Sequence, residues 1–395
     1  MSGTGSAGEV FAAFLKLGLT SFGGPIAHIG YFRDAFVVRR RWVDETAFAE
    51  LVSLCQFLPG PSSSQVGFAI GWLRAGPLGA LAAWTGFTLP SAMLMTAVAL
   101  GAAALQAAWL GGLVHGLKLV AVAVVAQAVF GMARTLTPDA RRAAIAVLAI
   151  GIVTFTSAFA GQIAAIGMGA LLGILLCRQQ DAALPTPLGL GISRRAGAVA
   201  IALFVAVLVG GPLLAAATGD PAVMHFNAFY RSGALVFGGG HVVLPLLQQA
   251  VVTPGWISQD SFLAGYGAAQ AMPGPLFTFA AYLGAALHEP PNSVAGAALA
   301  LAAIFLPGLL ALIAVVPFWN RLRGHPTARA ALAGANAAVV GILGAALYDP
   351  IWTSAVQGKA DFLAAVAGFM MLTALRAPPI AVVVLGAGFG LLSVL

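Results

Sequence analysis

Two Pro-Gly-Pro elements, Pro59-Gly60-Pro61 and Pro273-Gly274-Pro275, are the sharpest chemical feature of the sequence. Proline removes a backbone donor and glycine frees the φ angle, so each element is expected to interrupt a helix. A helix that begins after such a break points unpaired N–H groups and the positive end of its dipole toward the break. The pattern predicts an anion site, and the alternative is a pair of structural kinks. Hydroxyl donors follow both breaks: Ser62, Ser63, Ser64 and Thr278.

Two Phe-Gly-Gly elements are expected to break helices in the same way. They are Phe22-Gly23-Gly24 and Phe237-Gly238-Gly239-Gly240. Close contact between helices through small residues is the competing interpretation. Gln56 and Gln270 each stand three residues before a Pro-Gly-Pro element. We include all these residues in the candidate substrate site.

Two cations stand at equivalent places, because Lys16 precedes Phe22 by six residues and Arg231 precedes Phe237 by six. A cation inside a bilayer is costly and usually marks a substrate path or has a buried partner. Both side chains could instead extend to the headgroups from helix ends. Glu50 is the clearest carboxylate in an apolar stretch, and it either pairs with Lys16 or relays protons.

Four further residues are candidates for coupling or gating: His28, His115, Lys118 and His241. Histidine titrates near neutral pH, so His28 and His241 could carry protons. His115 and Lys118 share one helix face at i and i+3, which suits gating or a satisfied, packed pair. The sequence leaves both alternatives open.

Several function classes lack their usual signatures. Cys-x-x-Cys, His-Glu-x-x-His and P-loop patterns are absent, so we expect no metal, no cofactor and no catalytic constellation. The two cysteines, Cys55 and Cys177, lie in apolar stretches and are expected to be packed thiols. The net charge of +7 comes from short loops between apolar segments, which indicates membrane topology rather than nucleic-acid binding.

The elements that must position these residues are membrane helices. Charged side chains make up only 8% of the 395 residues, against about a quarter in a soluble domain, and 60% are apolar. At about 20 residues per helix, that composition predicts on the order of a dozen spans. About 13 apolar segments are expected, near 9–32, 44–73, 77–105, 111–132, 143–158, 160–177, 198–217, 225–248, 260–288, 292–317, 331–348, 361–376 and 378–395. Segments 9–32, 44–73, 225–248 and 260–288 either span fully or are re-entrant.

The second half of the chain repeats the first. The Phe-Gly-Gly elements, the Pro-Gly-Pro elements and the prolines Pro90 and Pro307 recur in the same order and at a nearly constant offset in the numbering. A colinear series of this kind indicates duplication. The expected organisation is an N-terminal repeat at 1–180, a linker at 181–224 with one transmembrane helix near 198–217, and a C-terminal repeat at 225–395.

The positions of the basic residues favour an inverted second repeat. If the linking helix reverses direction, all the basic loops that can be placed fall on one side, except Lys359. A parallel repeat would put the cluster from Arg321 to Arg329 on the wrong side. The predicted fold is therefore an all-α polytopic membrane protein of two inverted-topology helical repeats with broken or re-entrant helices. The N-terminus is expected in the cytoplasm and the C-terminus outside.

Taken as a set, these motifs closely resemble the chromate ion transporter family in its long, two-half form. The first series is Phe22-Gly23-Gly24-Pro25 with His28, Trp42-Val43 and Gln56-Phe57-Leu58-Pro59-Gly60-Pro61. The second is Phe237-Gly238-Gly239-Gly240-His241 with Pro245, Trp256-Ile257 and Ala271-Met272-Pro273-Gly274-Pro275. The resemblance implies export of chromate, a tetrahedral oxyanion like sulfate, across a bacterial cytoplasmic membrane, with chromate resistance as the consequence.

The combined expectation is a secondary transporter, not an enzyme, whose partners are a chromate- or sulfate-like oxyanion and the lipid bilayer. The sequence allows a homodimer and leaves the coupling ion open. Alternatives are a transporter of sulfate or another small anion, an ion channel, and a membrane enzyme acting on lipid phosphate.

Overall fold

The computed structural model describes residues 5–22, 24–104, 109–156, 158–177, 190–237, 240–319 and 325–393. Within these ranges the chain forms helices joined by turns and contains no strand, as the composition predicted. The first half comprises α1 (Ala7–Thr20), α2 (Gly24–Phe32), the π-helix η1 (Arg33–Arg39), α3 (Glu45–Phe57), α4 (Ser62–Ala104), α5 (Trp109–Leu136), α6 (Ala140–Phe155) and α7 (Ala158–Leu176).

The linking helix is α8 (Arg194–Thr218), and the second half follows it. That half comprises α9 (Pro221–Ala234), η2 (Gly240–Val242), α10 (Val243–Val251), α11 (Gln259–Ala269), η3 (Leu276–Thr278), α12 (Phe279–Ala285), α13 (Ser293–Val315), η4 (Val316–Phe318), α15 (Pro326–Ala346), η5 (Leu347–Trp352), α16 (Thr353–Ala355), α17 (Lys359–Thr373) and α18 (Pro379–Leu392).

Helices begin at matched capping residues in the two halves. The side chain of Asp44 accepts from the N–H of Ala47 at the start of α3, and Ser258 caps α11 in the same way at the equivalent position. A short polar side chain at this position satisfies an amide that the first turn leaves unpaired. The same local signal therefore starts equivalent helices in both repeats.

The predicted helix breaks are confirmed. Phe-Gly-Gly separates α1 from α2 and α9 from α10, and each Pro-Gly-Pro lies between a helix that ends and one that begins. Gly60 has a φ of +109° and Gly274 a φ of +91°, conformations that favour glycine. A kink at Ala75 and Gly76 divides α4 close to the predicted boundary between segments 44–73 and 77–105.

Five helical stretches in the described ranges are long and apolar enough to cross a membrane. They are Ser62–Gly101, Gly111–Leu136, Arg194–Thr218, Ser293–Phe318 and Pro326–Ala355. Other apolar helices, such as α17 with 15 residues and α18 with 14, are shorter than the roughly 20 residues of a full crossing. The chain is a multi-pass membrane protein.

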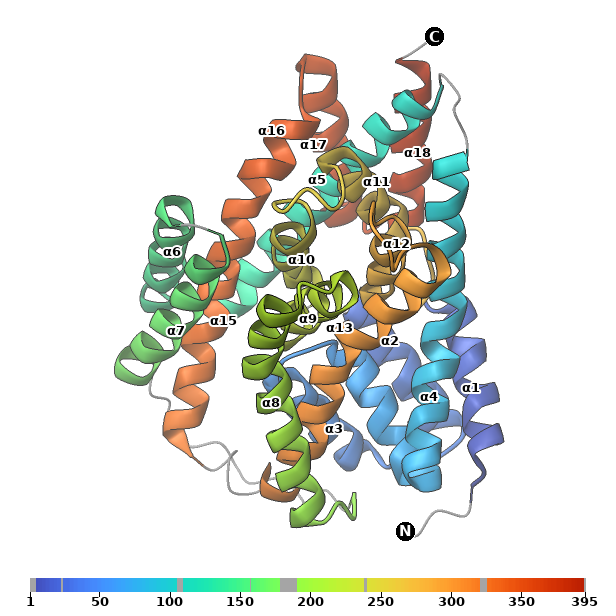
Figure 1. Cartoon of the computed structure of the whole chain (residues 1–395), viewed down its shortest axis with the longest axis vertical. Helices are drawn as coiled ribbons and strands as arrows, with labels where there is room; N and C mark the ends of the chain where they lie inside the picture. The colour runs from blue at the N-terminus through green and yellow to red at the C-terminus, as the bar shows by residue number, and fades with distance from the viewer. Residues whose placement is uncertain are drawn as a thin grey trace.

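The linking helix α8 packs on α9 and α13 through small residues, of which Gly197 and Ala200 are buried. Most of its other side chains are apolar and exposed, including Val199, Leu203 and Val209. Exposed apolar side chains on a helix of this length are typical of a lipid-facing surface. The two inverted repeats are therefore joined by a helix on the outside of the bundle (Figure 1).

The halves exchange helices rather than packing as separate bodies. Helix α15 of the second half packs on α6 and α7 of the first, and α5 of the first half packs on α17 and α18 of the second (Figure 1). Small residues allow this close approach, because Gly334 lies against the backbone of Gly169 and Gly173, and Gly116 against Gly386.

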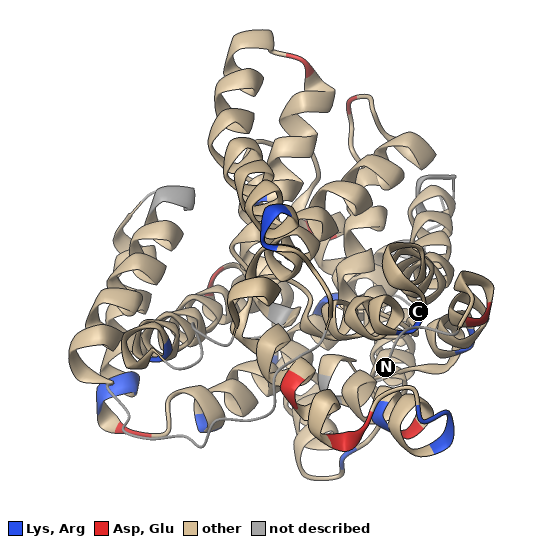
Figure 2. Cartoon of the chain, turned by 90° about the horizontal axis from the view of Figure 1, so that it is seen from below, with Lys and Arg blue, Asp and Glu red and all other residues tan. Residues whose placement is uncertain are grey.

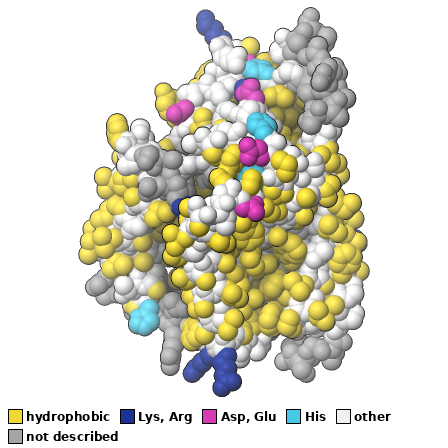
Figure 3. Space-filling model, in the orientation of Figure 1, with side chains coloured by type: hydrophobic (Ala, Val, Ile, Leu, Met, Phe, Trp, Pro, Cys, Tyr) yellow, Lys and Arg dark blue, Asp and Glu magenta, His cyan; other side chains and the backbone are white. Residues whose placement is uncertain are grey.

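Charged side chains are few among the described residues (Figures 2 and 3). Lys and Arg side chains mark both ends of the face in Figure 3, with the larger group at the lower end, whereas the visible Asp and Glu side chains lie in its upper half. The two termini lie at opposite ends of the long axis, the N-terminus below and the C-terminus above (Figure 1). Apolar side chains cover much of the surface between these ends (Figure 3).

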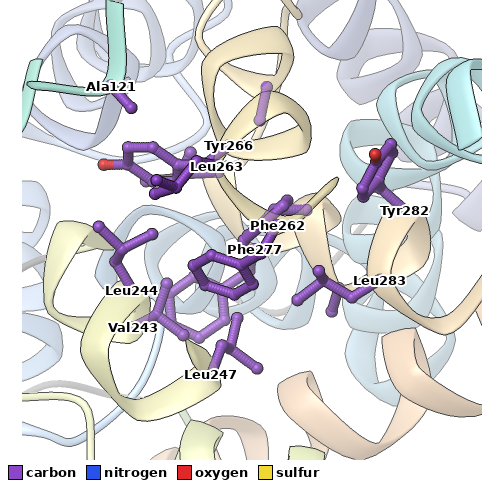
Figure 4. Close-up of a cluster of buried hydrophobic side chains, with 14 of the residues drawn as sticks. Ala121, Val243, Leu244, Leu247, Phe262, Leu263, Tyr266, Phe277, Tyr282 and Leu283 are labelled. Atoms are coloured by element: carbon purple, nitrogen blue, oxygen red, sulfur yellow. The ribbon is translucent and has the colours of Figure 1, made fainter. Parts of the chain in front are cut away.

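The largest buried core is built mainly by the second half. The rings of Phe262, Tyr266 and Phe277 are almost entirely removed from solvent and lie near aliphatic side chains of α10 (Figure 4), and the buried ring of Phe279 packs edge-on against Phe262 and Tyr266. Burying each such ring contributes roughly 1.5–3 kcal/mol before cavity and entropy costs. This apolar packing includes Leu276, the residue directly after the break at Pro273-Gly274-Pro275.

Candidate functional site

Reciprocal backbone hydrogen bonds join the two halves at their breaks. The N–H of Gly60 donates to the carbonyl of Val236, and the N–H of Gly274 donates to the carbonyl of Ser21, both at 2.8 Å. Ser21 and Val236 are equivalent residues, because each directly precedes a Phe-Gly-Gly element. Each Pro-Gly-Pro element is therefore fixed to the Phe-Gly-Gly element of the opposite half.

Close backbone contacts bring further equivalent residues to the same place. A Cβ added to Gly60 would lie 2.8 Å from the Cα of Gly308, and one added to Gly274 would lie 3.2 Å from the Cβ of Ser91. Ser91 and Gly308 are again equivalent, because they follow Pro90 and Pro307. We call this meeting point of the four broken elements the crossing.

The two Phe-Gly-Gly segments also meet each other. A Cβ added to Gly240 would lie 3.2 Å from the Cγ of Pro25, which follows Gly24. Gly24 itself has a φ of +78°. Three of the predicted glycines, Gly23, Gly238 and Gly239, lie outside the described residues, as does the side chain of His241.

The remaining predicted backbone residues differ in their surroundings. Gly60, Pro61, Ser63, Pro273 and Pro275 are buried. Partly exposed positions are Phe22, Pro59, Ser62, Gln270 and Gly274, and Gln56 is exposed on α3. The amide of Gln270 donates to the carbonyl of Tyr266 one turn earlier, at 3.5 Å.

The start of α4 carries polar contacts that the Pro-Gly-Pro pattern alone did not predict. The Nδ1 atom of His28 lies 3.4 Å from the hydroxyl of Ser63. The Nε2 group of Gln65 donates to the carbonyls of Pro59, at 2.9 Å, and Gly308, at 2.8 Å. Gln65 therefore closes the break against the opposite half. The sequence feature that could have identified Gln65 is its position four residues after Pro61, as a polar residue in an otherwise apolar helix.

Several buried polar atoms near the crossing have no hydrogen-bond partner among the described residues. They are Ser21 Oγ, His28 Nε2, Ser64 Oγ, Gln65 Oε1 and Thr88 Oγ1. Leaving a buried donor or acceptor unpaired costs about 1–3 kcal/mol, so such a group indicates a place for a polar ligand or water. Ser21, Gln65 and Thr88 were missed from the sequence because single polar residues in apolar helices carry no pattern.

The two predicted cations lie in different surroundings. Lys16 is exposed on α1, on the side opposite the buried residues Val10, Phe14 and Gly18. Arg231 is half-buried in the last turn of α9. Glu50 is buried and accepts a hydrogen bond of 2.6 Å from the indole N–H of Trp319 on the opposite half.

His115 and Lys118 each pair with a carboxylate of the second half. His115 Nε2 lies 2.8 Å from Asp361, and Lys118 Nζ lies 2.7 Å from Asp260. Asp361 also accepts from the backbone N–H groups of Gln357 and Gly358 at the start of α17. These pairs tie α5 to α17 and α11 and satisfy the polar side chains of His115 and Lys118, which stand among apolar neighbours.

Comparison with known proteins agrees with the duplicated architecture. The model of the chromate transporter family matches residues 8–174 and, separately, 223–391. A chromate transport protein of Pseudomonas aeruginosa is 29% identical over 360 residues, covering 86% of this chain and 80% of that protein. A probable chromate transport protein of Synechococcus elongatus is 28% identical over 338 residues, covering 85% and 82%.

A chromate transport protein of Cupriavidus metallidurans is 25% identical over 377 residues, covering 91% of this chain and 86% of that protein. No solved structure matches the chain. The family match covers both repeats and the four broken elements that meet at the crossing. The chain therefore belongs to the chromate transporter family.

Proposed function

We propose that this protein is a secondary transporter that exports chromate from the cytoplasm and so confers chromate resistance. The observation that carries the proposal is the reciprocal pair of hydrogen bonds at Gly60 and Gly274, which brings four broken elements of a chromate transporter chain to one place. Broken helices inside a membrane protein are tolerated where they are packed or line a polar cavity. In transporters built from inverted repeats, such breaks bind the substrate.

The proposed substrate site is the crossing together with the residues predicted from the sequence. Helix α4 begins directly after Pro61, so its first N–H groups and its dipole favour a negative charge there. Arg231, half-buried on α9, would add positive potential, and Lys16 would attract the anion from the exposed side of α1. Glu50, His115, Lys118 and His241 would serve coupling or gating. His28, which lies beside Ser63 at the start of α4, would combine such a role with contact to the substrate.

The proposed membrane is the bacterial cytoplasmic membrane, with the N-terminus inside and the C-terminus outside. Two features support this orientation: the termini lie at opposite ends of the molecule, and a group of Lys and Arg side chains marks the lower end (Figures 1 and 3). The sequence contains no P-loop, so we propose an ion gradient or the membrane potential as the energy source. The protein could act as a monomer or as a homodimer.

Sulfate is the second candidate substrate. Chromate and sulfate share tetrahedral shape and charge, and backbone N–H groups at a helix start recognise both features without distinguishing the central atom. Residues 8–174 and 223–391 match a family of transporters, which disfavours a lipid phosphate enzyme.

Chromate uptake into inverted membrane vesicles under an imposed proton gradient tests the proposal. The expected result is saturable uptake that excess sulfate inhibits and that vesicles lacking the protein do not show. Absence of chromate uptake by correctly inserted protein would contradict the proposal. Sulfate uptake without chromate uptake would establish the second candidate instead.

A further inference from the structure

The two repeats are structurally equivalent at the crossing but chemically different. Trp42 and Val43 both donate their N–H groups to the carbonyl of Phe36, and Trp256 and Ile257 both donate to the carbonyl of Val251. Phe36 and Val251 are separated by the same offset in the numbering as the Phe-Gly-Gly elements. This shared geometry fixes which residues of α2 and α10 correspond.

Equivalent positions then show a one-sided distribution of polar side chains. Ser21 corresponds to Val236 and His28 to Val243, at the offset of the Phe-Gly-Gly elements. Thr88 corresponds to Phe305, because each stands two positions before the matched proline of its half. In each of these pairs both members are buried. Polar groups of the first half thus correspond to apolar groups in the second.

At a fourth pair of equivalent positions, both residues carry a hydroxyl group, but only the second-half hydroxyl has a hydrogen-bond partner. Ser64 corresponds to Thr278, whose hydroxyl is hydrogen-bonded to Ser91 and to the carbonyl of Pro275. The residue equivalent to Ser91 is Gly308, which has no side chain to offer to Ser64. The hydroxyl of Ser64 is therefore left without a partner within the described part of the chain.

We define the first-half polar cluster as the four residues Ser21, His28, Ser64 and Thr88, each no more than 2% exposed. Each carries a buried polar atom that no described residue pairs. Unpaired polar atoms are rare in native interiors and usually mark a ligand or an ordered water. None of the equivalent second-half side chains carries such an atom in the described residues.

Contacts place this cluster at the crossing. His28 lies within 3.4 Å of Ser63, in the first turn of α4, and its ring packs edge-on to Phe87, the neighbour of Thr88. The backbone of Ser21 lies beside the His28 ring and accepts from Gly274. His28 and Ser21 therefore lie between the start of α4, which carries Ser64, and the second Pro-Gly-Pro element. Thr88 directly follows Phe87, whose carbonyl oxygen would lie 3.2 Å from a Cβ added to Gly274.

We propose that the transported oxyanion binds on the first half alone, hydrogen-bonded by the first-half polar cluster beside the start of α4. The equivalent second-half surface is apolar at three positions, and its one hydroxyl, that of Thr278, is already paired. When Ser63 donates to Nδ1 of His28, the ring hydrogen is on Nε2, which becomes a donor. Three hydroxyls complete the set. Neutral donors and a helix start stabilise a small oxyanion without requiring a cation in direct contact.

Gln65 has a different role from the cluster. Its NH2 group is committed to two carbonyl acceptors, so its orientation is fixed and its free atom is the acceptor Oε1. An acceptor repels an anion. Gln65 is therefore a positioning residue that holds the break closed and does not contact the oxyanion.

This inference rests on the proposed function, and paired substitutions separate the two. The experiment measures chromate binding to the purified full-length protein in detergent by isothermal titration calorimetry, with sulfate as a second probe. His28→Val and Ser21→Val install the second-half residue type in the first half. Val243→Thr adds a hydroxyl at the position equivalent to His28 and serves as the matched control.

We expect wild-type protein to bind chromate, and His28→Val and Ser21→Val each to weaken binding at least about tenfold, as for a lost hydrogen bond to a charged group. Val243→Thr should bind within about twofold of the wild type, and His28→Gln, which retains an N–H donor, should recover part of the loss. Size-exclusion elution of every variant reports folding. If His28→Val aggregates, Ser21→Val and His28→Gln still decide the question.

Two results would overturn the inference while leaving the proposed function standing. One is binding by both Val variants that equals the wild type, and the other is an equal loss in Val243→Thr, which would indicate a symmetric site. Wild-type protein that binds neither chromate nor sulfate would overturn both proposals.

Discussion

Replacing Gly60 with alanine is expected to lower the free energy of unfolding, because the backbone at the crossing leaves no room for a side chain at this position. At a φ of +109°, a residue with a Cβ costs about 1–3 kcal/mol in backbone strain. The new Cβ would also lie 2.8 Å from the Cα of Gly308, a backbone atom that can yield only if α13 shifts. That shift weakens the hydrogen bond to Val236, worth about 0.5–1.5 kcal/mol. The expected loss is about 2–4 kcal/mol in the free energy of unfolding.

The equivalent change, Gly274→Ala, should cost less. Its Cβ would lie 3.2 Å from both the Phe87 carbonyl oxygen and the Ser91 Cβ, so these neighbours must yield less than Gly308 must at the 2.8 Å approach of Gly60→Ala. Gly131→Ala is the control, because that glycine lies exposed in α5 with nothing within 4 Å of the added atom. Alanine there should be neutral or stabilise by up to about 1 kcal/mol.

Unfolding of the purified proteins in sodium dodecyl sulfate, followed by tryptophan fluorescence, measures these differences. The predicted order of stability is Gly131→Ala at least equal to wild type, then Gly274→Ala, then Gly60→Ala. Gly60→Ala within about 0.5 kcal/mol of the wild type would refute the reasoning, since that value is below the strain alone.

Three other contacts between elements give predictions of their own. Asp260→Asn should destabilise the protein by about 1–2 kcal/mol, because it leaves the nearly buried ammonium group of Lys118 without its partner. Lys118→Met should cost less, because the carboxylate left behind is 65% exposed to solvent. Equal losses of the two variants in detergent unfolding would contradict this. Gly334→Leu should abolish the monodisperse size-exclusion peak, since α15 and α7 touch through backbone there; a normal peak would contradict it. Glu9→Gln should cost less than about 1 kcal/mol, with a smaller effect at high salt, because its partner Arg74 is partly exposed; a salt-independent effect would contradict this.

The sequence predicted the fold and the helix breaks of the candidate site because both depend on local chemistry. Pro-Gly-Pro breaks a helix wherever it occurs, and the nearly constant offset between matched motifs identifies which breaks are equivalent. The kink at Ala75 and Gly76 and the long linking helix followed from the same apolar and glycine patterns.

Contacts between distant elements could not be predicted in this way. Lys118 of α5 pairs with Asp260 of α11 in the opposite half, and nothing near either residue indicates the other. The exchange of α5 and α15 between the halves depends on glycines that only tertiary packing brings together. Ser21 and Thr88 could be identified as candidate ligands only from the structure, which shows that their hydroxyl groups are buried and have no hydrogen-bond partner among the described residues.

Counterflow in proteoliposomes is the measurement that tests the central claim, a single anion site at the crossing that opens to either side in turn. Purified protein would be reconstituted into vesicles loaded with unlabelled chromate, and entry of radiolabelled chromate would be followed. The account predicts transient accumulation of label above equilibrium, absent from empty vesicles and suppressed by external sulfate. Rapid, non-saturating entry without accumulation would indicate a channel, and it would contradict an alternating-access transporter built on the crossing.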